Sequence, residues 1–343
     1  TANLVTLSTS KTGGTIDDSS GTSDDSIVDI TGSTVKLDSK GDIGVTGAGE
    51  GLDISASILD ISTANNGGTS GKIFIQELST GATKLTVDTA NVTAVAGTIA
   101  IVSAGSLAID AVTSGGVTKA NLVTVETTAT GGTILDFDDS NNTGVDIFGT
   151  TVKLDSQGDM GHTDTGKGLD ISATILDITT TDNSGTSGSV FIQQAGTADT
   201  KLTVDTASAA TKSGTISIDS AGSLTIDAVA SGAEGSTANL VTLSTSKTGG
   251  TIDDFSATSD DSVVDITGST VKLDSQGDIG ATGSGEELDI SATTLDVSTS
   301  VNVATSGSIY LNQLVDQITR LDVDSANTTS TGVIIIKSAG NLT

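Results

Sequence analysis

The chain has 343 residues with a formal net charge of −29, no cysteine, no proline, no tryptophan and only 2% aromatic residues. This charge excludes a nucleic-acid binder, which needs a basic surface to neutralise phosphates, and it disfavours docking on anionic lipid headgroups. Aromatic residues usually supply much of the buried area of a globular core, so the Val, Ile, Leu and Ala of this chain predict a narrow aliphatic core instead.

The polar composition predicts strands and turns rather than helices. Only six of the 43 acidic residues are glutamate, and Gly, Ser, Thr and Asp are abundant. Aspartate favours turns and strand ends, whereas glutamate favours helices. No apolar run approaches the roughly 18 residues of a membrane span, so we expect no membrane insertion.

One segment of about 118 residues occurs almost three times. Its clearest part is TVKLDSKGDI at 34–43, which returns as TVKLDSQGDM at 151–160 and as TVKLDSQGDI at 270–279. The copies are 1–118, 119–236 and a truncated third at 237–343. No change of composition marks a linker, so we expect one continuous body.

Short apolar-x-apolar triplets follow one another along each copy, separated by Gly, Ser, Thr and Asp. In the first copy, Ile16, Val35, Ile54, Ile75 and Ile99 are separated by 19, 19, 21 and 24 residues. Alternation with period two predicts short strands with one buried face. Steps of about 20 residues are typical of the coils of a parallel β-solenoid, in which stacking makes a continuous core.

The sequence therefore predicts an all-β fold, a parallel β-solenoid (β-helix) with five or six coils in each copy of about 118 residues. Val35, Leu37, Leu52, Ile54, Ile73, Ile75, Ile99 and Ile101 should point inward, and Lys36, Asp53 and Ala100 outward. The alternative is a row of immunoglobulin-like β-sandwiches of about 100 residues each. The missing buried aromatics and long alternating strands favour the solenoid.

No catalytic constellation is present, so we expect a non-enzymatic protein. His162 is the only histidine, and no residue type near it suggests a metal or catalytic partner. Serine and aspartate occur throughout the chain, so their presence does not indicate a catalytic triad.

Aspartates in glycine-containing loops are the candidate metal ligands. Calcium takes six to eight oxygens from carboxylates and carbonyls, so acidic loops with glycine turns make calcium the candidate cofactor, although a solvated acidic turn is the favoured interpretation of these residues. The candidates are Asp38, Asp42, Asp155, Asp159, Asp274, Asp278, Asp17, Asp18, Asp253 and Asp254, and the adjacent pairs Asp24–Asp25, Asp138–Asp139 and Asp260–Asp261 are of the same kind.

Two lines of the sequence carry a resemblance to a known group of proteins. Residues 97–110 read GTIAIVSAGSLAID, and residues 214–227 read GTISIDSAGSLTID. These lines resemble the coils of filamentous-haemagglutinin-type bacterial surface proteins and, more widely, of large repetitive adhesins and of surface-layer or filament proteins. The resemblance implies an extracellular, cell-surface location, a right-handed β-helix and a structural or adhesive role.

Near-identical copies favour a scaffold, because a binding or catalytic site tends to break repetition. We therefore expect a structural module, a rod, filament or surface-layer segment formed by self-association. An adhesin stalk or glycan-binding module is the alternative, and a polysaccharide-lyase-type enzyme comes third. Neither end of the sequence looks like a polar cap, so we expect either end-to-end or lateral packing with another copy or a longer parent chain. We also expect calcium to stiffen or assemble the rod.

Overall fold

The computed structural model describes residues 3–18, 27–45, 51–64, 71–89, 97–115, 121–137, 144–162, 168–183, 186–206, 214–232, 239–255, 263–282, 287–302, 305–316, 319–325 and 332–343. The described residues form strands and turns without a helix, as the composition predicts. The chain divides into two compact units, Thr1–Ala173 and Thr174–Thr343, and this division falls inside the second sequence copy.

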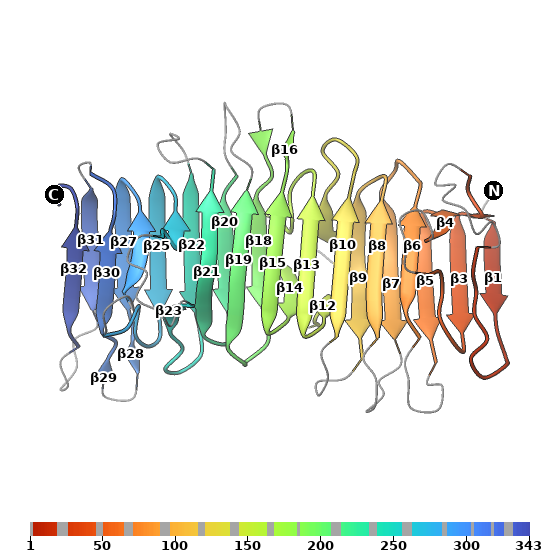
Figure 1. Cartoon of the computed structure of the whole chain (residues 1–343), viewed down its shortest axis with the longest axis horizontal. Coiled ribbons are helices and arrows are strands. Elements are labelled where there is room, and N and C mark those ends of the chain that lie inside the picture. Colours follow the sequence, from red (N-terminus) through yellow and green to blue (C-terminus); the bar gives the residue numbers. More distant parts are fainter. Residues whose placement is uncertain are drawn as a thin grey trace. The chain divides into compact units, whose positions relative to one another are not determined.

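Unit 1 is a parallel β-solenoid with two sheets (Figure 1). The chain alternates between the sheets, and each long strand pairs in parallel with the strands one coil before and after it. Sheet 1a contains β1 (Leu4–Ser8), β3 (Thr34–Ser39), β5 (Ile58–Thr63), β7 (Thr83–Thr89), β9 (Leu107–Ser114), β11 (Ile134–Asp136), β12 (Ile147–Phe148) and β14 (Leu169–Ser172). Sheet 1b contains β2 (Ile30–Thr31), β4 (Leu52–Ser55), β6 (Ile73–Glu77), β8 (Thr98–Ser103), β10 (Leu122–Thr127) and β13 (Thr151–Ser156).

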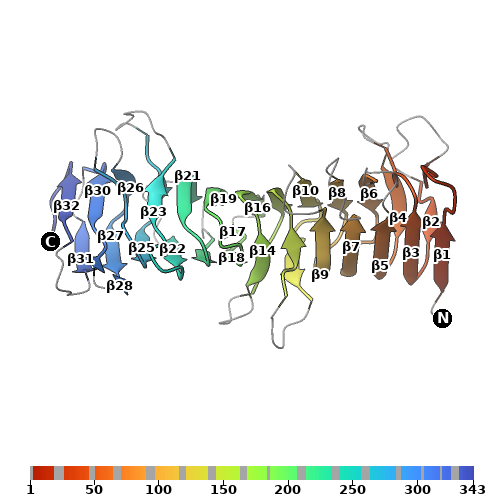
Figure 2. The same ribbon diagram turned by 90° about the horizontal axis from the view of Figure 1, so that it is seen from below.

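Unit 2 is built in the same way (Figures 1 and 2). Sheet 2a contains β18 (Val190–Gln194), β20 (Ile216–Ser220), β22 (Leu240–Thr245), β25 (Thr270–Ser275), β27 (Thr294–Thr299) and β31 (Arg320–Ser325). Sheet 2b contains β15 (Ile175–Thr180), β19 (Thr200–Thr206), β21 (Leu224–Ser231), β23 (Ile252–Asp254), β24 (Ile266–Thr267), β26 (Leu288–Ser291), β30 (Ile309–Gln313) and β32 (Ile334–Ser338). Two antiparallel hairpins leave the coils, β16 (Asp182–Asn183) with β17 (Thr186–Ser187) and β28 (Val301–Asn302) with β29 (Thr305–Ser306).

The core consists of aliphatic side chains stacked from coil to coil. Val35, Leu59 and Leu85 are opposite one another in register and are fully buried. All eight residues predicted to point inward are buried, and Lys36 is exposed, as predicted. Asp53 was predicted to point outward and is instead only 5% exposed. That prediction was wrong because alternation tells which side of a strand a residue occupies but not what neighbouring coils place over that side.

The structural repeat is one coil of about 25 residues, not the segment of about 118 residues. The step is 24 residues from Val35 to Leu59 and 26 from Leu59 to Leu85. The spacing of about 20 residues read from the sequence was too short, because both strands of a coil carry the same apolar-x-apolar pattern. Ile54 and Ile75, taken from that series, lie in one sheet, whereas Val35 lies in the other.

Equivalent strands of successive sequence copies lie in opposite sheets. The first copy forms nine described strands, β1 to β9, which alternate between the sheets. Because nine is odd, the second copy begins on the other sheet. The strand TVKLDS is accordingly β3 of sheet 1a in the first copy and β13 of sheet 1b in the second. In unit 2, β19 and its third-copy equivalent β31 are likewise on different sheets. The two faces of a coil therefore accept the same sequence.

Buried hydroxyls at strand ends hold the turns between the sheets. Ser39 Oγ donates to the carbonyl of Gly14 (2.8 Å) and accepts from the amide of Gly41 (3.2 Å). Its third-copy equivalent, Ser275 Oγ, donates to the carbonyl of Gly250 (2.7 Å) and accepts from the amide of Gly277 (3.1 Å). These bonds satisfy backbone groups that the turns would otherwise leave buried and unpaired.

Glycine follows these hydroxyls because the coils approach too closely for a side chain. A Cβ built on Gly105 would lie 2.2 Å from the carbonyl oxygen of Gly81 in the preceding coil, and one built on Gly222 would lie 2.2 Å from that of Ala198. The Ser-x-Gly spacing in the sequence is therefore a requirement of coil stacking.

Candidate functional site

Two of the predicted metal-ligand pairs, Asp38 with Asp42 in the first copy and Asp274 with Asp278 in the third, link neighbouring coils. Asp38 lies on the outer side of β3, where it accepts the hydroxyl of Ser62 (3.5 Å), and Asp42 accepts the backbone amide of Lys72 (2.8 Å). In the third copy, Asp274 accepts the hydroxyl of Ser298 (3.0 Å), and Asp278 accepts the amide of Ser308 (2.6 Å). The two acids of each block thus bind different groups of the next coil.

The second copy differs at this position because its neighbour is also acidic. Asp155 stands opposite Glu126 of β10 in register, where the other copies have serine. Burial raises the pKa of Asp155. Burial and the negative charge of Asp155 together raise the pKa of Glu126. The carbonyl of Asp159 accepts the amide of Ile134 (3.1 Å), so this residue also contributes to the turn.

Among the adjacent acid pairs, Asp253–Asp254 of the third copy lies close to Asp278, another candidate metal ligand. Asp253 is near Asp278, Asp199 and Asp254, whose charges raise its pKa after the larger effect of burial. The hydroxyl of Thr251 donates to Asp253 (2.6 Å) and opposes that rise. In the first copy, Asp17 is exposed and Asp18 is half-buried. The pairs Asp24–Asp25, Asp138–Asp139 and Asp260–Asp261 lie outside the described residues.

No group of three or more His, Cys, Asp and Glu side chains arranged to hold a metal ion occurs within the described ranges. Calcium binding by these acids stays a prediction. His162 is part of the described chain and lies at a turn after β13.

A set of acids that the sequence reasoning missed clasps adjacent coils in every copy, and all of them except the exposed Asp29 are buried. In the third copy, the Asp265 carboxylate accepts the amide of Asp289 (2.7 Å), and the amide of Asp265 donates to the carbonyl of Asp289 (2.9 Å). Asp146 with Asp170 repeats this geometry at 2.8 Å for both bonds, and Asp29 with Asp53 at 3.1 and 2.9 Å. The signal was present as Leu-Asp-Ile-Ser preceded, 24 residues earlier, by Asp-Ile.

Burial and the charges of neighbouring acids raise the pKa of two of these clasp acids, Asp265 and Asp170. Burial raises the pKa of Asp265 to about 7, with the charges of Asp254, Asp289 and Asp227 adding to the rise and the Asp289 amide opposing it. Burial, followed by the charge of Asp136, raises the pKa of Asp170 to about 6. Desolvation disfavours the ionised carboxylate, so these groups titrate close to neutral pH.

Glu77, at the end of β6, is a buried acid that the other two copies replace with glutamine. Its carboxylate accepts the amides of Ala56 (3.0 Å) and Ser79 (3.1 Å), and burial raises its pKa. At the same position, Gln194 Nε2 donates to the hydroxyl of Thr200 (2.6 Å) and Gln313 Nε2 to that of Thr319 (2.9 Å). The place therefore requires hydrogen bonding but not charge.

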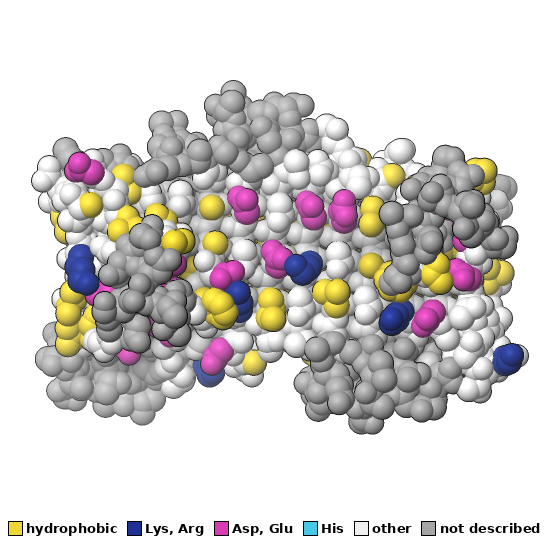
Figure 3. Space-filling model, in the orientation of Figure 1, with side chains coloured by type: hydrophobic (Ala, Val, Ile, Leu, Met, Phe, Trp, Pro, Cys, Tyr) yellow, Lys and Arg dark blue, Asp and Glu magenta, His cyan; other side chains and the backbone are white. Residues whose placement is uncertain are grey.

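The outer faces of the sheets carry ion pairs between neighbouring coils, and Figure 3 shows acidic and basic side chains interspersed with apolar ones. Lys84 pairs with Asp110 (3.1 Å), and its ammonium lies 3.7 Å from the centre of the Phe137 ring. Lys201 does the same with Asp227 (3.2 Å) and Phe255 (3.7 Å). Both aspartates are the extra residues of β-bulges, which turn them toward the lysine of the preceding coil. Both phenylalanines are about half exposed.

No family model, curated protein or solved structure matches this chain. No helix in the described part is long and apolar enough to cross a membrane. The local chemistry is therefore the basis for assigning a function.

Proposed function

We propose that this chain is a non-enzymatic structural module that forms an extracellular rod, filament or surface-layer segment by self-association. The observation that carries the proposal is the regular stacking of similar coils. Val35, Leu59 and Leu85 belong to three successive coils, lie opposite one another in register and are fully buried. Such a stack of similar coils is the architecture of extended repeat scaffolds.

The chemistry of the remaining surface supports a scaffold. Several of the described acids accept hydrogen bonds from the next coil, as Asp42, Asp278 and Asp265 do. Such groups hold a stack together. The extracellular location belongs to the proposal through the resemblance of residues 97–110 and 214–227 to bacterial surface proteins.

The test is to follow the full chain by sedimentation over a wide range of concentrations and to image the products by negative-stain microscopy. We expect oligomers whose length grows with concentration. A monomer that persists at high concentration would overturn the proposal. Surface labelling of intact cells of the source organism tests the location separately.

Calcium is the cofactor we propose for this assembly. With a net charge of −29 and 14 basic residues, repulsion opposes contact between molecules, and a bound cation reduces it locally. The degree of assembly and the melting temperature should therefore be higher in calcium than in a chelator at matched ionic strength. Equal behaviour in the two buffers would show that the acids only keep the protein soluble.

A second candidate function is glycan binding on an adhesin stalk, and the Lys–Asp–Phe arrangement favours it. Phe137 and Phe255 offer half-exposed aromatic rings beside a carboxylate and an ammonium. Rings of this kind stack on apolar faces of ligands, and the charged groups accept and donate hydrogen bonds. Binding to an immobilised glycan panel that Phe255→Ala weakens would support this function, whereas binding unaffected by the paired Phe137→Ala and Phe255→Ala changes would exclude these rings.

A further inference from the structure

Uncharged side chains cover most of the outer side of three neighbouring strands of unit 1. β6, β8 and β10 are parallel neighbours in sheet 1b, and Figure 2 shows them side by side in one layer, with β5, β7 and β9 in the other. Burial alternates along each of the three strands, so every second residue points outward. Six of these outward residues form what we call the neutral face: Phe74, Thr98, Ala100, Val102, Leu122 and Thr124.

The register of the strands places Ala100 at the centre of the neutral face. Ala100 lies opposite Phe74 of β6 and opposite Thr124 of β10. Thr98 and Val102 flank it along β8. All six side chains of the face are half-buried, so they cover the sheet surface without a gap that only a large side chain would fill. The face is therefore continuous, with its smallest side chain in the middle.

Charged residues border the neutral face without entering it. Glu126 follows Thr124 on the outer side of β10, and Lys153 of β13 lies opposite Thr124. Beyond β6, Gln76 lies opposite Asp53, which is only 5% exposed. An uncharged centre with charged residues at the rim is the usual composition of a protein–protein contact.

The other sheet of the same unit has a charged outer side. Strands β3, β5, β7 and β9 of sheet 1a present six ionisable side chains there, namely Lys36, Asp38, Asp60, Lys84, Asp88 and Asp110. Four of them form the ion pairs Lys36–Asp60 (2.7 Å) and Lys84–Asp110 (3.1 Å). The two outer sides of unit 1 therefore differ in charge although their strands share the same apolar-x-apolar pattern.

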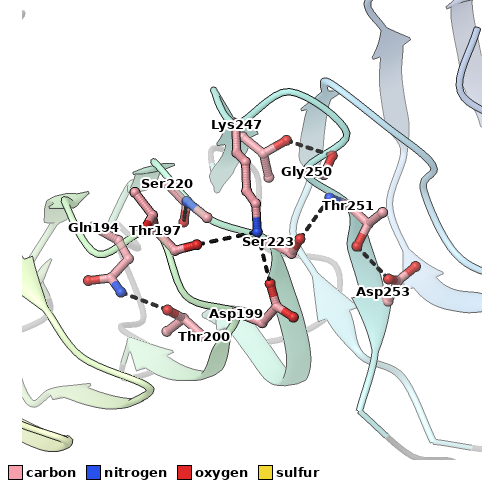
Figure 4. Close-up of polar contacts among 12 residues, drawn as sticks. Gln194, Thr197, Asp199, Thr200, Ser220, Ser223, Lys247, Gly250, Thr251 and Asp253 are labelled. Atoms are coloured by element: carbon pink, nitrogen blue, oxygen red, sulfur yellow. Dashed lines mark hydrogen bonds and ion pairs between the residues drawn. The ribbon is translucent and has the colours of Figure 1, made fainter. Parts of the chain in front are cut away.

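The turns between the sheets also carry acidic side chains. In the part of unit 2 drawn in Figure 4, the ammonium of Lys247 lies 3.5 Å from the carboxylate of Asp199. Close by, the hydroxyl of Thr251 donates to the carboxylate of Asp253 (2.6 Å). A second acidic molecule that approaches such a turn meets carboxylates, which repel it.

The equivalent face of unit 2, on β18, β20 and β22, contains a charge. Ser217 takes the place of Ala100 there. Asp219 takes the place of Val102, is exposed and accepts the hydroxyl of Ser244 (3.0 Å). Of these two equivalent faces, that of unit 1 is the one without charge.

We propose that the neutral face of unit 1 is a lateral contact with a second copy of this chain, in which the two faces pack against each other with Ala100 near Ala100 of the second copy. This inference rests on the proposed self-association and specifies a surface for it. With a net charge of −29 the molecules repel each other, and burying an unpaired carboxylate is strongly unfavourable. The neutral face lets two copies of this acidic chain touch without burying one.

The symmetry and the size of the contact follow from the face itself. Both molecules use the same surface, so the contact is isologous and a two-fold axis passes near its centre, at Ala100. Three strands about 4.8 Å apart, with about five residues of 3.3 Å each, cover roughly 200 to 250 Å². This area is well below the roughly 800 Å² per partner of a stable dimer, so we expect a weak and reversible contact that is seen at high protein concentration.

Two charges of opposite sign at the centre of the face test the proposal. Ala100→Asp changes the net charge from −29 to −30, and Ala100→Lys changes it to −28. Both should weaken assembly several-fold in sedimentation, because each buries an isolated charge in the contact. If net charge alone governed assembly, the two variants would shift it in opposite directions.

The matched control is Ala108→Asp. Ala108 is a half-buried alanine on the outer side of β9, in sheet 1a of the same unit. This change also gives a net charge of −30, and it should leave assembly close to that of the unmodified chain. Circular dichroism of all three variants shows whether each retains the fold, since the substituted side chains point away from the core.

Chemical cross-linking tests the symmetry, because the chain has no cysteine of its own. Packed sheets lie about 10 Å apart, which is too far for a disulfide between facing residues. A short bifunctional thiol reagent should therefore join two Ala100→Cys chains into a dimer. Ala108→Cys chains, treated in the same way, should give several-fold less dimer.

The outcomes separate this contact from assembly in general. Equal assembly of Ala100→Asp and Ala108→Asp chains, opposite effects of Asp and Lys at position 100, or equal dimer yields from the two cysteine variants would overturn the contact while the unmodified chain still forms oligomers. Failure of the unmodified chain to assemble at all would overturn the proposed function, and this contact with it.

Discussion

β1 and β22 have almost the same sequence but opposite environments. Leu243 of β22 lies between β20 and β25 and is fully buried, whereas β1 pairs only with β3 among the described strands and its Leu7 is 39% exposed. The difference cannot come from the residues or their neighbours in sequence. In a solenoid, burial of a strand depends on whether a coil lies on each side of it.

The largest expected effect comes from removing the two equivalent leucines. Leu243→Ala should destabilise unit 2 by about 3 kcal/mol, because it leaves a cavity inside the stack. Leu7→Ala should cost about 1 kcal/mol or less, since this side chain already contacts water. Chemical denaturation followed by circular dichroism measures the loss of stability in both variants. Equal losses of stability in the two variants would contradict the comparison.

A smaller effect is expected at Asp265, a buried clasp acid, whose titration should differ from that of an exposed acid. The pKa of Asp265 is raised to about 7, so the folded state retains a proton that the unfolded chain loses near pH 4. The folded state therefore binds more protons between these values, and stability falls as pH rises from about 4 to about 7. Asp265→Asn should flatten this part of the profile and stabilise unit 2 at pH 8 by about 2 kcal/mol.

The matched control is Asp205→Asn, which changes an exposed aspartate on β19 of the same unit. We expect it to leave the shape of the pH profile as in the unmodified chain. If Asp205→Asn and Asp265→Asn have the same profile of stability against pH, Asp265 does not retain a proton in the folded state.

Glu77 allows glutamate to be compared with glutamine at one position, because the second and third copies have Gln194 and Gln313 there. Burial raises the pKa of its carboxyl, so ionisation above that pKa destabilises unit 1. Glu77→Gln places the residue of the second and third copies in the same hydrogen-bonding position and should stabilise unit 1 by about 1 kcal/mol at pH 8, with little change at pH 4. The reverse change, Gln194→Glu, should destabilise unit 2 at pH 8. A Glu77→Gln chain less stable at pH 8 would show that the charge itself is required.

The smallest effects are expected on the outer faces. Lys272 pairs with Asp296 (3.4 Å) between half-exposed side chains, so Lys272→Met should change stability by about 0.5 kcal/mol or less. Lys84 also lies over the Phe137 ring, and Lys84→Met should cost somewhat more, about 1 kcal/mol. Thermal melts at low and high salt distinguish the two, because only the ion-pair contribution is screened.

Much of the fold follows from local pattern. Apolar-x-apolar triplets between Gly, Ser, Thr and Asp predict short strands, and their repetition predicts a parallel solenoid with an aliphatic core, which is confirmed. The turns were also present in the sequence as Ser-x-Gly. The reason for the glycine is visible only in the structure, where a Cβ on Gly105 would lie 2.2 Å from the carbonyl oxygen of Gly81 in the preceding coil.

The candidate site could be predicted only in part. The sequence identified Asp42 and Asp278 as candidate metal ligands because they recur in glycine turns. In the structure each of them accepts a backbone amide of the next coil. It did not identify Asp53, Asp170 and Asp265, because an aspartate between apolar residues looks like an outward-facing residue. Their burial depends on groups about 24 residues away in the chain.

The sequence by itself determined the kind of strand, the aliphatic core and the chemistry of the turns, since these depend on residues a few positions apart. Only the tertiary structure decided the coil of about 25 residues, the alternation of copies between sheets and the contrast between Leu7 and Leu243. A side-chain pattern of period two is the same on both faces of a coil and in every copy. Which strand lies beside which is fixed by the path of the chain between them, and that path sets burial, pKa and the open edges.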